Sequence, residues 1–323
     1  MSEQIKRIYN SGIAKETTRG TKIAPTFWLK PTSFDVQDKI EVVKSERAFG
    51  RQEARDDAII GKKYSAGSIE GEVFDKSFGL FLLGSMGEVS TSTVESGVYA
   101  HTFSVLQSSQ HPSFTIVEKR GDIEQVAYVN SVIETLDLDL AVNDYIKFKA
   151  GIKGLSQVAD SSTVTYADEN YFMAKNVTIK TADAYDDVSS GDEICAKNLT
   201  LSISKEIQDD DCLGSEEPTD FLNQNFSLTG EMEIYYSSVY ERDYALENTL
   251  KAMEITIEDT NTTIGSALHP KMVIKLAKVK FEEPEISSNN NEIVRLVLKF
   301  EAYYSTEDEL LGNIVLTNEQ ISY

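Results

Sequence analysis

The chain has 323 residues, of which 41% are hydrophobic and 26% are charged, so its composition is that of a globular protein rather than a disordered one. Acidic residues number 53 and basic residues 31, and the net charge of −22 disfavours tight binding to nucleic-acid phosphates. The two cysteines, Cys195 and Cys212, form neither a disulfide framework nor a CxxC metal site and predict a reducing compartment. No segment has the pattern of a signal peptide or a membrane span.

The first part of the chain carries a tryptophan and then a long charged stretch. Trp28 is predicted to be a buried anchor or an interface residue. Residues 44–63 have a net charge of 6 − 4 = +2 and little periodicity, and a loop this long inside a compact domain is usually functional or disordered. Four acids interrupt the stretch and Phe49 is its one aromatic residue, which disfavours a nucleic-acid site. Its basic residues are the candidate contact residues of the chain: Lys44, Arg47, Arg51, Arg55, Lys62 and Lys63.

A strand at residues 68–73, a short apolar helix at 77–84 and a hairpin follow. The hairpin joins a strand ending at Val142 to one beginning at Ile146, with leucines alternating along the first strand. A three-residue loop, 143–145, pairs Leu140 with Phe148 and Asp139 with Lys149, so both faces match in kind. A two-residue turn would set Leu140 opposite Lys147. The sequence therefore predicts the three-residue loop.

The second part of the chain repeats this character. Period-two alternation predicts strands with one wet face at 199–203, 226–234 and 294–302. Residues 205–220 form a second long charged stretch, of net charge 1 − 7 = −6, opposite in sign to the first. Residues 236–253 have the spacing of an amphipathic helix over part of their length. Short connections and few helices predict an antiparallel, all-β protein with one or two short helices.

Two short motifs recur in the same order along the chain. SIEGEV at 68–73 returns as SLTGEM at 227–232, and IKFKA at 146–150 returns as LKFEA at 298–302. The shared order favours an internal duplication, in which Gly71 corresponds to Gly230 and Phe148 to Phe300. Each glycine stands in mid-strand, which usually marks a bulge or a close backbone approach. The two domains would be 1–153 and 169–323 with a linker at 154–168; the alternative is coincidence among similar strands of one larger domain.

The residues that catalysis or cofactor binding needs do not form a recognisable motif. His101, His111 and His269 lie in different contexts, and the two that precede prolines are predicted to be turn residues rather than ligands. Neither GxGxxG nor GxxxxGK[ST] occurs. The acidic runs at 186–187 and 209–211 are predicted to be solvated loops rather than Ca²⁺ sites, and carboxylates are too abundant for any pair to indicate glycoside hydrolysis. We therefore expect no enzyme activity and no cofactor.

Several segments, taken in order, resemble the tail tube proteins of tailed bacteriophages. In the first half they are GIAKETT at 12–18, GSIEGE at 67–72 and FGLFLLG at 78–84. In the second half they are LTLSISK at 199–205, LGS at 213–215, FSLTGE at 226–231 and the strands around Val273 and Phe300. The resemblance covers roughly residues 10–305. Residues after Tyr304 resemble no appended immunoglobulin-like domain.

The resemblance implies a fold and a function. The fold is a β-sandwich flanked by a helix, here present as two tandem domains, whose inner strands join those of neighbours into a barrel around a DNA channel. Long loops would clasp the next ring, and residues 44–63 are the expected inter-ring loop. A duplicated chain implies rings of three copies with pseudo-sixfold symmetry, the alternative being six copies of one larger domain. The family has no catalytic residues to carry over.

The implied partners are other copies of the chain, the tape measure protein and tail-end proteins, with DNA passing through the lumen without specific binding. The protein would be part of the virion, made and assembled in the bacterial host cytoplasm, with no membrane contact. The main rival is a β-sandwich adhesin or carbohydrate-binding module. That rival predicts export and aromatic platforms, and this sequence offers a single tryptophan and no export signal.

Overall fold

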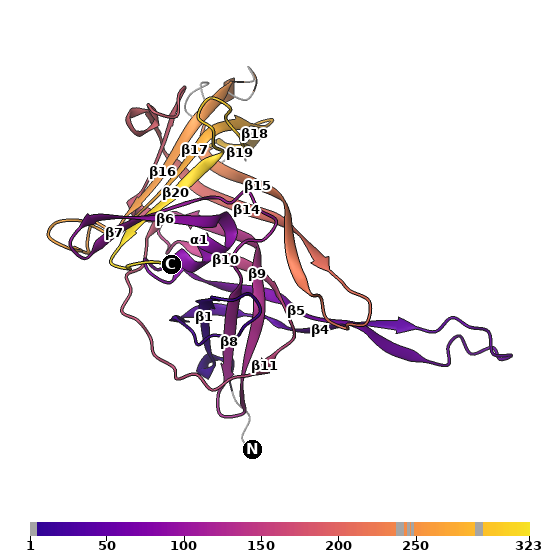
Figure 1. The fold of residues 1–323 in the computed structure, drawn as a ribbon. Coiled ribbons are helices and arrows are strands. Elements are labelled where there is room, and N and C mark those ends of the chain that lie inside the picture. Colours follow the sequence, from indigo (N-terminus) through magenta and orange to yellow (C-terminus); the bar gives the residue numbers. More distant parts are fainter. Residues whose placement is uncertain (1–4, 237–241, 244–245, 247–248, 288–292) are drawn as a thin grey trace.

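The computed structural model of the chain describes residues 5–236, 242–243, 246, 249–287 and 293–323. Within these residues β-strands dominate, and one α-helix is described over its whole length, which confirms the predicted all-β class (Figure 1). The elements of the first part are β1 (Asn10–Lys15), β2 (Phe27–Leu29), β3 (Pro31–Phe34), β4 (Gln37–Lys44), β5 (Ala58–Glu72), α1 (Phe78–Met86), β6 (Gly87–Glu95), β7 (Val98–Val105), β8 (Phe114–Arg120), β9 (Glu124–Ala141), β10 (Lys147–Gly154) and β11 (Val158–Ala159). Those of the second part are β12 (Val177–Ala182), β13 (Asp192–Ile194), β14 (Ala196–Asp210), β15 (Asp220–Tyr235), β16 (Leu250–Glu258), β17 (Lys271–Phe281), β18 (Glu285–Ser287), β19 (Arg295–Tyr303) and β20 (Gly312–Asn318). Short 3-10 turns occupy Lys6–Ile8, Ala174–Asn176 and Val188–Ser190.

One long antiparallel sheet runs through both parts of the chain. Its order is β5, β10, β9, β14, β15, β19 and β17, with β3 and β4 following one another along the outer side of β5. The middle of this sheet is the pairing of β9 with β14, from Ala141 opposite Asn198 to Thr135 opposite Ser204. We call this pairing the in-chain junction, because it joins the two parts into a continuous sheet.

A second layer covers one face of the long sheet in each part. In the first part it is β2, β1, β8, the beginning of β9, and β11. In the second part it is β13, β12, β16, the beginning of β17, and then β20, β7 and β6. Strands β9 and β17 therefore belong to both layers. The hairpin β6–β7 comes from the first part of the chain but completes the outer sheet of the second part.

The two parts have the same strand order in sequence and in space. In the first part the neighbours are β2, β1, β8, β9, β10 and β5, followed by β3 and β4. In the second part they are β13, β12, β16, β17, β19, β15 and β14. Each strand of one list occupies the same place along the chain as its counterpart in the other.

The two glycine strands share a local arrangement as well. Gly71 pairs with Phe148, and Gly230 pairs with Phe300. A Cβ atom at Gly71 would lie 3.1 Å from the Phe148 ring, and one at Gly230 would lie 2.3 Å from the Phe300 ring. The group close to each glycine is an aromatic ring, not the bulge or backbone approach that was predicted.

Helix α1 confirms the predicted apolar helix at 77–84 and is buried on every side. Its sequence, FGLFLLGSM, has no polar face, as expected for a helix that is surrounded by both layers and the β6–β7 hairpin. Phe81 packs on Phe148 with ring centroids 4.7 Å apart, which fixes the helix on the long sheet. Gly87 ends the helix with φ of 97° and donates its N–H to the Leu83 carbonyl.

The predicted hairpin register after β9 is wrong by two residues. Leu138, not Leu140, lies opposite Phe148, and Asp139 lies opposite Lys147. The cause is competition from another segment, because Ile146 donates its backbone N–H to Phe172 and Tyr145 bridges to Met173. The connection is therefore longer than three residues, although the predicted faces are kept because the slip is an even number.

The prediction of a helix over part of 236–253 fits the helical conformation of Arg242, Asp243 and Leu246, whereas Leu250 begins strand β16. Most of the rest of this segment lies outside the described residues. Trp28 is buried as predicted, with 2% of its surface exposed, and packs with Val117 and Ala127. None of the described helices is long and apolar enough to cross a membrane.

Candidate functional site

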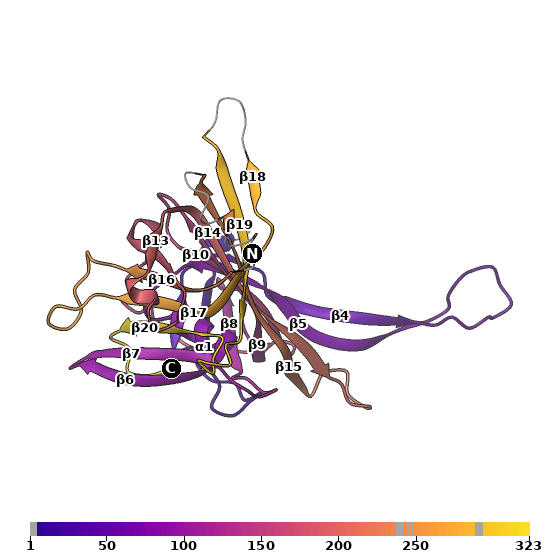
Figure 2. The ribbon, with the colours of Figure 1, turned by 90° about the horizontal axis from the view of Figure 1, so that it is seen from above.

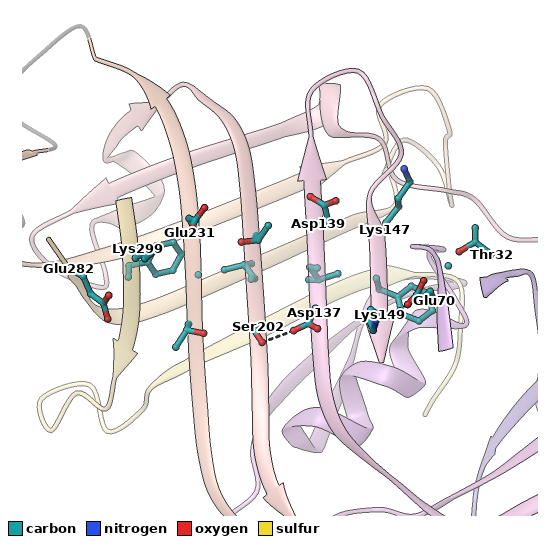
Figure 3. A pocket seen from close by; sticks show the side chains of 18 residues that line it. Thr32, Glu70, Asp137, Asp139, Lys147, Lys149, Ser202, Glu231, Glu282 and Lys299 are labelled. Carbon is teal, nitrogen blue, oxygen red and sulfur yellow. Dashed lines mark hydrogen bonds and ion pairs between the residues drawn. The ribbon is translucent and has the colours of Figure 1, made fainter. Parts of the chain in front are cut away.

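The long sheet has one packed face and one polar face, which follows from the period-two alternation of its strands. Leu138, Leu201 and Phe300 point to the packed side and are nearly inaccessible. Their neighbours in sequence point the other way and line a shallow hollow of about 710 Å³ across seven adjacent strands, from β3 to β19 (Figure 3). We call this side the polar face. Its labelled side chains include Glu70, Asp137, Asp139, Lys147, Lys149, Ser202, Glu231, Glu282 and Lys299.

Acids and bases alternate across the polar face, so its lysines lie beside carboxylates. Lys149 pairs with Glu70 at 2.9 Å, and that carboxylate raises the pKa of the Lys149 ammonium above its usual value. Lys299 lies 2.7 Å from Glu285, whose hydrogen bond raises the Lys299 pKa in the same way. The Ser202 hydroxyl donates to Asp137 across the in-chain junction at 2.6 Å. The residues that line the hollow include five acids and three lysines, so the polar face carries a small excess of acids.

A second feature is a long hairpin formed by β4 and β5, which projects far from the body of the molecule (Figure 2). We call it the arm. Most of the predicted charged loop at 44–63 belongs to it, and the strands extend further than predicted, so Lys62 and Lys63 lie in β5. Near the tip, Arg47 lies 2.9 Å from Asp56 and Arg55 lies 3.7 Å from Glu46. Lys44 and Arg51 are exposed.

The base of the arm contacts the acidic stretch of the same chain, which is the β14–β15 hairpin. Lys62 lies 2.6 Å from Asp209 and 2.7 Å from Asp211, and Lys63 lies 2.6 Å from Glu216. Two of the six candidate residues, Lys62 and Lys63, therefore contact the acidic stretch. The other four lie along the outer part of the arm. The opposite net charges of 44–63 and 205–220 thus meet within one chain, whereas the sequence led us to expect 44–63 to act between rings.

Exposed apolar residues lie along the arm, and the sequence analysis missed them. Val42 lies opposite Ile60, and Val43 lies opposite Ile59. Successive residues of a strand point to opposite faces, so each face of this ribbon carries one apolar pair. The exposed fractions range from 38% for Ile60 to 63% for Ile59. An isolated two-stranded hairpin is marginally stable in water, so burial against another surface would stabilise the arm.

A buried cation beside the C-terminal end of α1 was also missed. Lys205 is 2% exposed and donates to the Gly84 carbonyl at 2.6 Å, which places a positive charge at the negative end of the helix. Burial lowers its pKa to about 7. His111, predicted to be a turn residue, is buried 3.3 Å away, and burial lowers its pKa to about 4.

Groups suited to chemistry do not converge within the described part of the chain. No cluster of three or more His, Cys, Asp or Glu side chains suited to a metal ion occurs among those residues. Cys195 and Cys212 are exposed and free, and Asp209 and Asp211 bond the Lys62 ammonium.

The comparisons with known proteins agree with this picture. No curated protein matches the chain. The sequence profile described as phage tail tube protein matches residues 10–302, nearly the whole chain and both of its matching strand sets. The β-rich fold fits that match. The chain belongs to the phage tail tube protein family.

Proposed function

We propose that three copies of this chain close into one ring of the tail tube, and that each copy supplies two equivalent units of an internal duplication. The carrying observation is the in-chain junction, where two units of the same strand order already stand side by side in one sheet. Each unit contributes four strand positions to the long sheet. Rotation about an axis would continue that sheet from chain to chain, and closure removes its open edges.

The polar face would line the channel. The packed face is covered by α1 and the outer sheets, whereas the polar face of the long sheet is open. Lysines beside carboxylates, such as Lys149 beside Glu70, offer DNA phosphates no concentrated positive charge. At a Debye length of about 8 Å, these wall charges act only on DNA that passes close to them.

The arm would contact the next ring. Its exposed apolar pairs give it a packing surface. Arg47, Arg51 and Arg55 are exposed, and Arg47 and Arg55 would exchange their pairing with acids of the arm for acids of the neighbour. Individual surface charge pairs are weak, so the apolar pairs would supply most of the binding. The acidic surface of the neighbouring ring would complement the arginines. The tape measure protein and the tail-end proteins are the further partners that this function requires, with assembly in the host cytoplasm.

Averaged electron micrographs of the purified protein test this function. We expect tubes whose rings have threefold symmetry, with two similar but distinct densities for each chain. Rings of six identical chains would reject the duplication and keep the tube. Dispersed particles under all assembly conditions would reject the proposed function and favour the rival binding module.

A further inference from the structure

The ends of β9 and β17, which correspond in the two parts of the chain, pair with different neighbours. At the junction, the end of β9 is held by β14 over seven residue pairs. The corresponding end of β17 is held instead by the first residues of β16, with Leu250 opposite Lys280 and Lys251 opposite Val279. The β16–β17 register shifts by one residue directly after this contact. The chain thus covers part of its own edge.

The register of a junction between chains follows from the matching pairs inside the chain. At the in-chain junction, Leu201, which pairs with Gly230, lies opposite Leu138, which pairs with Phe148. The counterpart of Leu201 is Pro31, because Pro31 pairs with Gly71. The counterpart of Leu138 is Phe281, because Phe281 pairs with Phe300.

The same correspondence places opposite charges together. One residue along the junction, Thr200 lies opposite Asp139 on the polar face. Their counterparts are Lys30, which precedes Pro31, and Glu282, which donates its N–H to the Lys299 carbonyl and lines the polar-face hollow. The edge beyond Glu282 is acidic, with exposed Glu283 and Glu285.

The opposite edge is basic. A groove of about 670 Å³ runs beside β3 and is lined by Lys6, Arg7 and Lys30. These three side chains are exposed, so their charges are available to a neighbouring molecule. The acidic edge of one copy and the basic edge of another are therefore complementary in charge and in strand polarity.

We infer that the junction between chains repeats the register of the in-chain junction, with Lys30 of one copy opposite Glu282 of the next, and that Leu250 and Lys251 leave the edge of β17 to admit β3. This inference rests on the proposed function. It makes the first residues of β16 a cover that keeps the free subunit from adding strands at this edge. Ring closure then requires the exchange of two backbone pairs within the chain for pairs between chains.

A disulfide lock tests the cover. In a background with Cys195→Ser and Cys212→Ser, the pair Leu250→Cys and Lys280→Cys joins residues that lie directly opposite. We expect the oxidised variant to stay folded by circular dichroism but to form no tubes, and reductant to restore them. The matched control is Thr256→Cys with Val273→Cys, a lock on the same strand pair away from the edge, which leaves assembly intact. Normal tubes from the oxidised 250–280 lock would overturn the inference.

A cross-linking experiment tests the register in assembled tubes. With Lys30→Cys and Glu282→Cys in the same background, we expect covalent dimers and trimers on a non-reducing gel. The control pair, Lys30→Cys with Glu283→Cys, differs by one residue and faces the other side of the strand, so it should cross-link poorly. Tubes in which the control pair links better than the 30–282 pair would reject the register and leave the proposed function standing. Absence of tubes from the wild-type chain would reject the proposed function itself.

Discussion

The two halves of the molecule share a strand order but differ in what is attached to it. The first half carries the long arm, a buried helix and the β6–β7 hairpin, whereas the second half has the shorter acidic β14–β15 hairpin and the C-terminal strand β20. The shared part is the long sheet, where Gly71 lies under Phe148 and Gly230 under Phe300. The comparison teaches that packing constrains the sheet in both halves, while the attached hairpins are free to take opposite charges and different lengths.

The largest loss of stability is expected on removal of the aromatic side chains that cover the two glycines, Phe148 and Phe300. Phe300→Ala should lower the free energy of unfolding by about 3–5 kcal/mol, because it removes a side chain that is 1% exposed and leaves a cavity. Phe148→Ala should cost a similar amount, since the ring also packs on Phe81. Urea unfolding is followed by circular dichroism and by the fluorescence of Trp28, which reports on the first half. If one of the two variants lost less than about 1 kcal/mol while the other lost the expected amount, the two phenylalanines would not be equivalent in the two halves.

A smaller effect should distinguish the two glycines. Gly230→Ala should cost about 2 kcal/mol, because its Cβ would lie 2.3 Å from the Phe300 ring and something must shift. Gly71→Ala should cost less, because its Cβ would lie 3.1 Å from Phe148. The control is Gly230→Ala combined with Phe300→Leu, which relieves the clash and should recover part of the loss. The same urea titration compares all three variants, and equal costs for the two glycines would contradict this ranking.

The two halves should differ in how their stability depends on pH. Strand β14 of the second half buries Lys205, whereas its counterparts in the first half, β3 and β4, bury no lysine or arginine. The pKa of Lys205 is lowered to about 7 in the folded chain but is near 10.4 in the unfolded chain. Between these values the unfolded state binds more protons, so stability should rise with pH, by at most about 1.4 kcal/mol per unit.

Lys205→Met should flatten this rise, and Lys299→Met on the polar face serves as the control that keeps it. Urea titrations at pH 7, 8 and 9 measure the effect. A slope that is unchanged in Lys205→Met would show that another group titrates.

The smallest effect on subunit stability is expected at the tip of the arm. Reversing Arg47, Arg51 and Arg55 to glutamate should change the free energy of unfolding by less than about 1 kcal/mol, because these charges are exposed. Tube growth should nevertheless be impaired, which light scattering and microscopy can measure. The control is the reversal of three lysines elsewhere on the surface, the exposed Lys175 and the half-buried Lys119 and Lys180. Normal tubes from the arm variant would rule out a docking role for the arginines.

Much of the fold could be predicted from local patterns, and the rest depended on contacts between distant segments. Period-two alternation located β14, β15 and β19, and the apolar run located α1, because those patterns reflect the faces that are buried. The β9–β10 register could not be predicted, because Phe172 takes the N–H of Ile146. Leu250 was wrongly predicted to be helical from its spacing to other apolar residues, because it pairs with Lys280 of β17 instead.

The candidate surfaces were predicted in the same uneven way. Charge counts located the arm and its acidic counterpart, but not the contact of Lys62 with Asp209 within the chain, since the opposite charges were expected to act between rings. The apolar pairs of the arm were hidden because Val42 and Ile60 become neighbours only once the hairpin register is known. Lys205 carried no local signal, because its burial depends on α1 and on His111, which is 94 positions away.

The position of β20 has a consequence for how the chain is made. This last strand lies between β7 and β17, and Ile314 pairs with Phe103, which is 0% exposed in the finished fold. While the ribosome still holds residues 312–318, the outer sheet of the second half stays open and the β6–β7 hairpin has no partner strand. Pairings of such long sequence separation form slowly. Folding of this sheet is therefore completed only after residues 312–318 have left the ribosome, and until then the outer layer that would support a ring is unfinished.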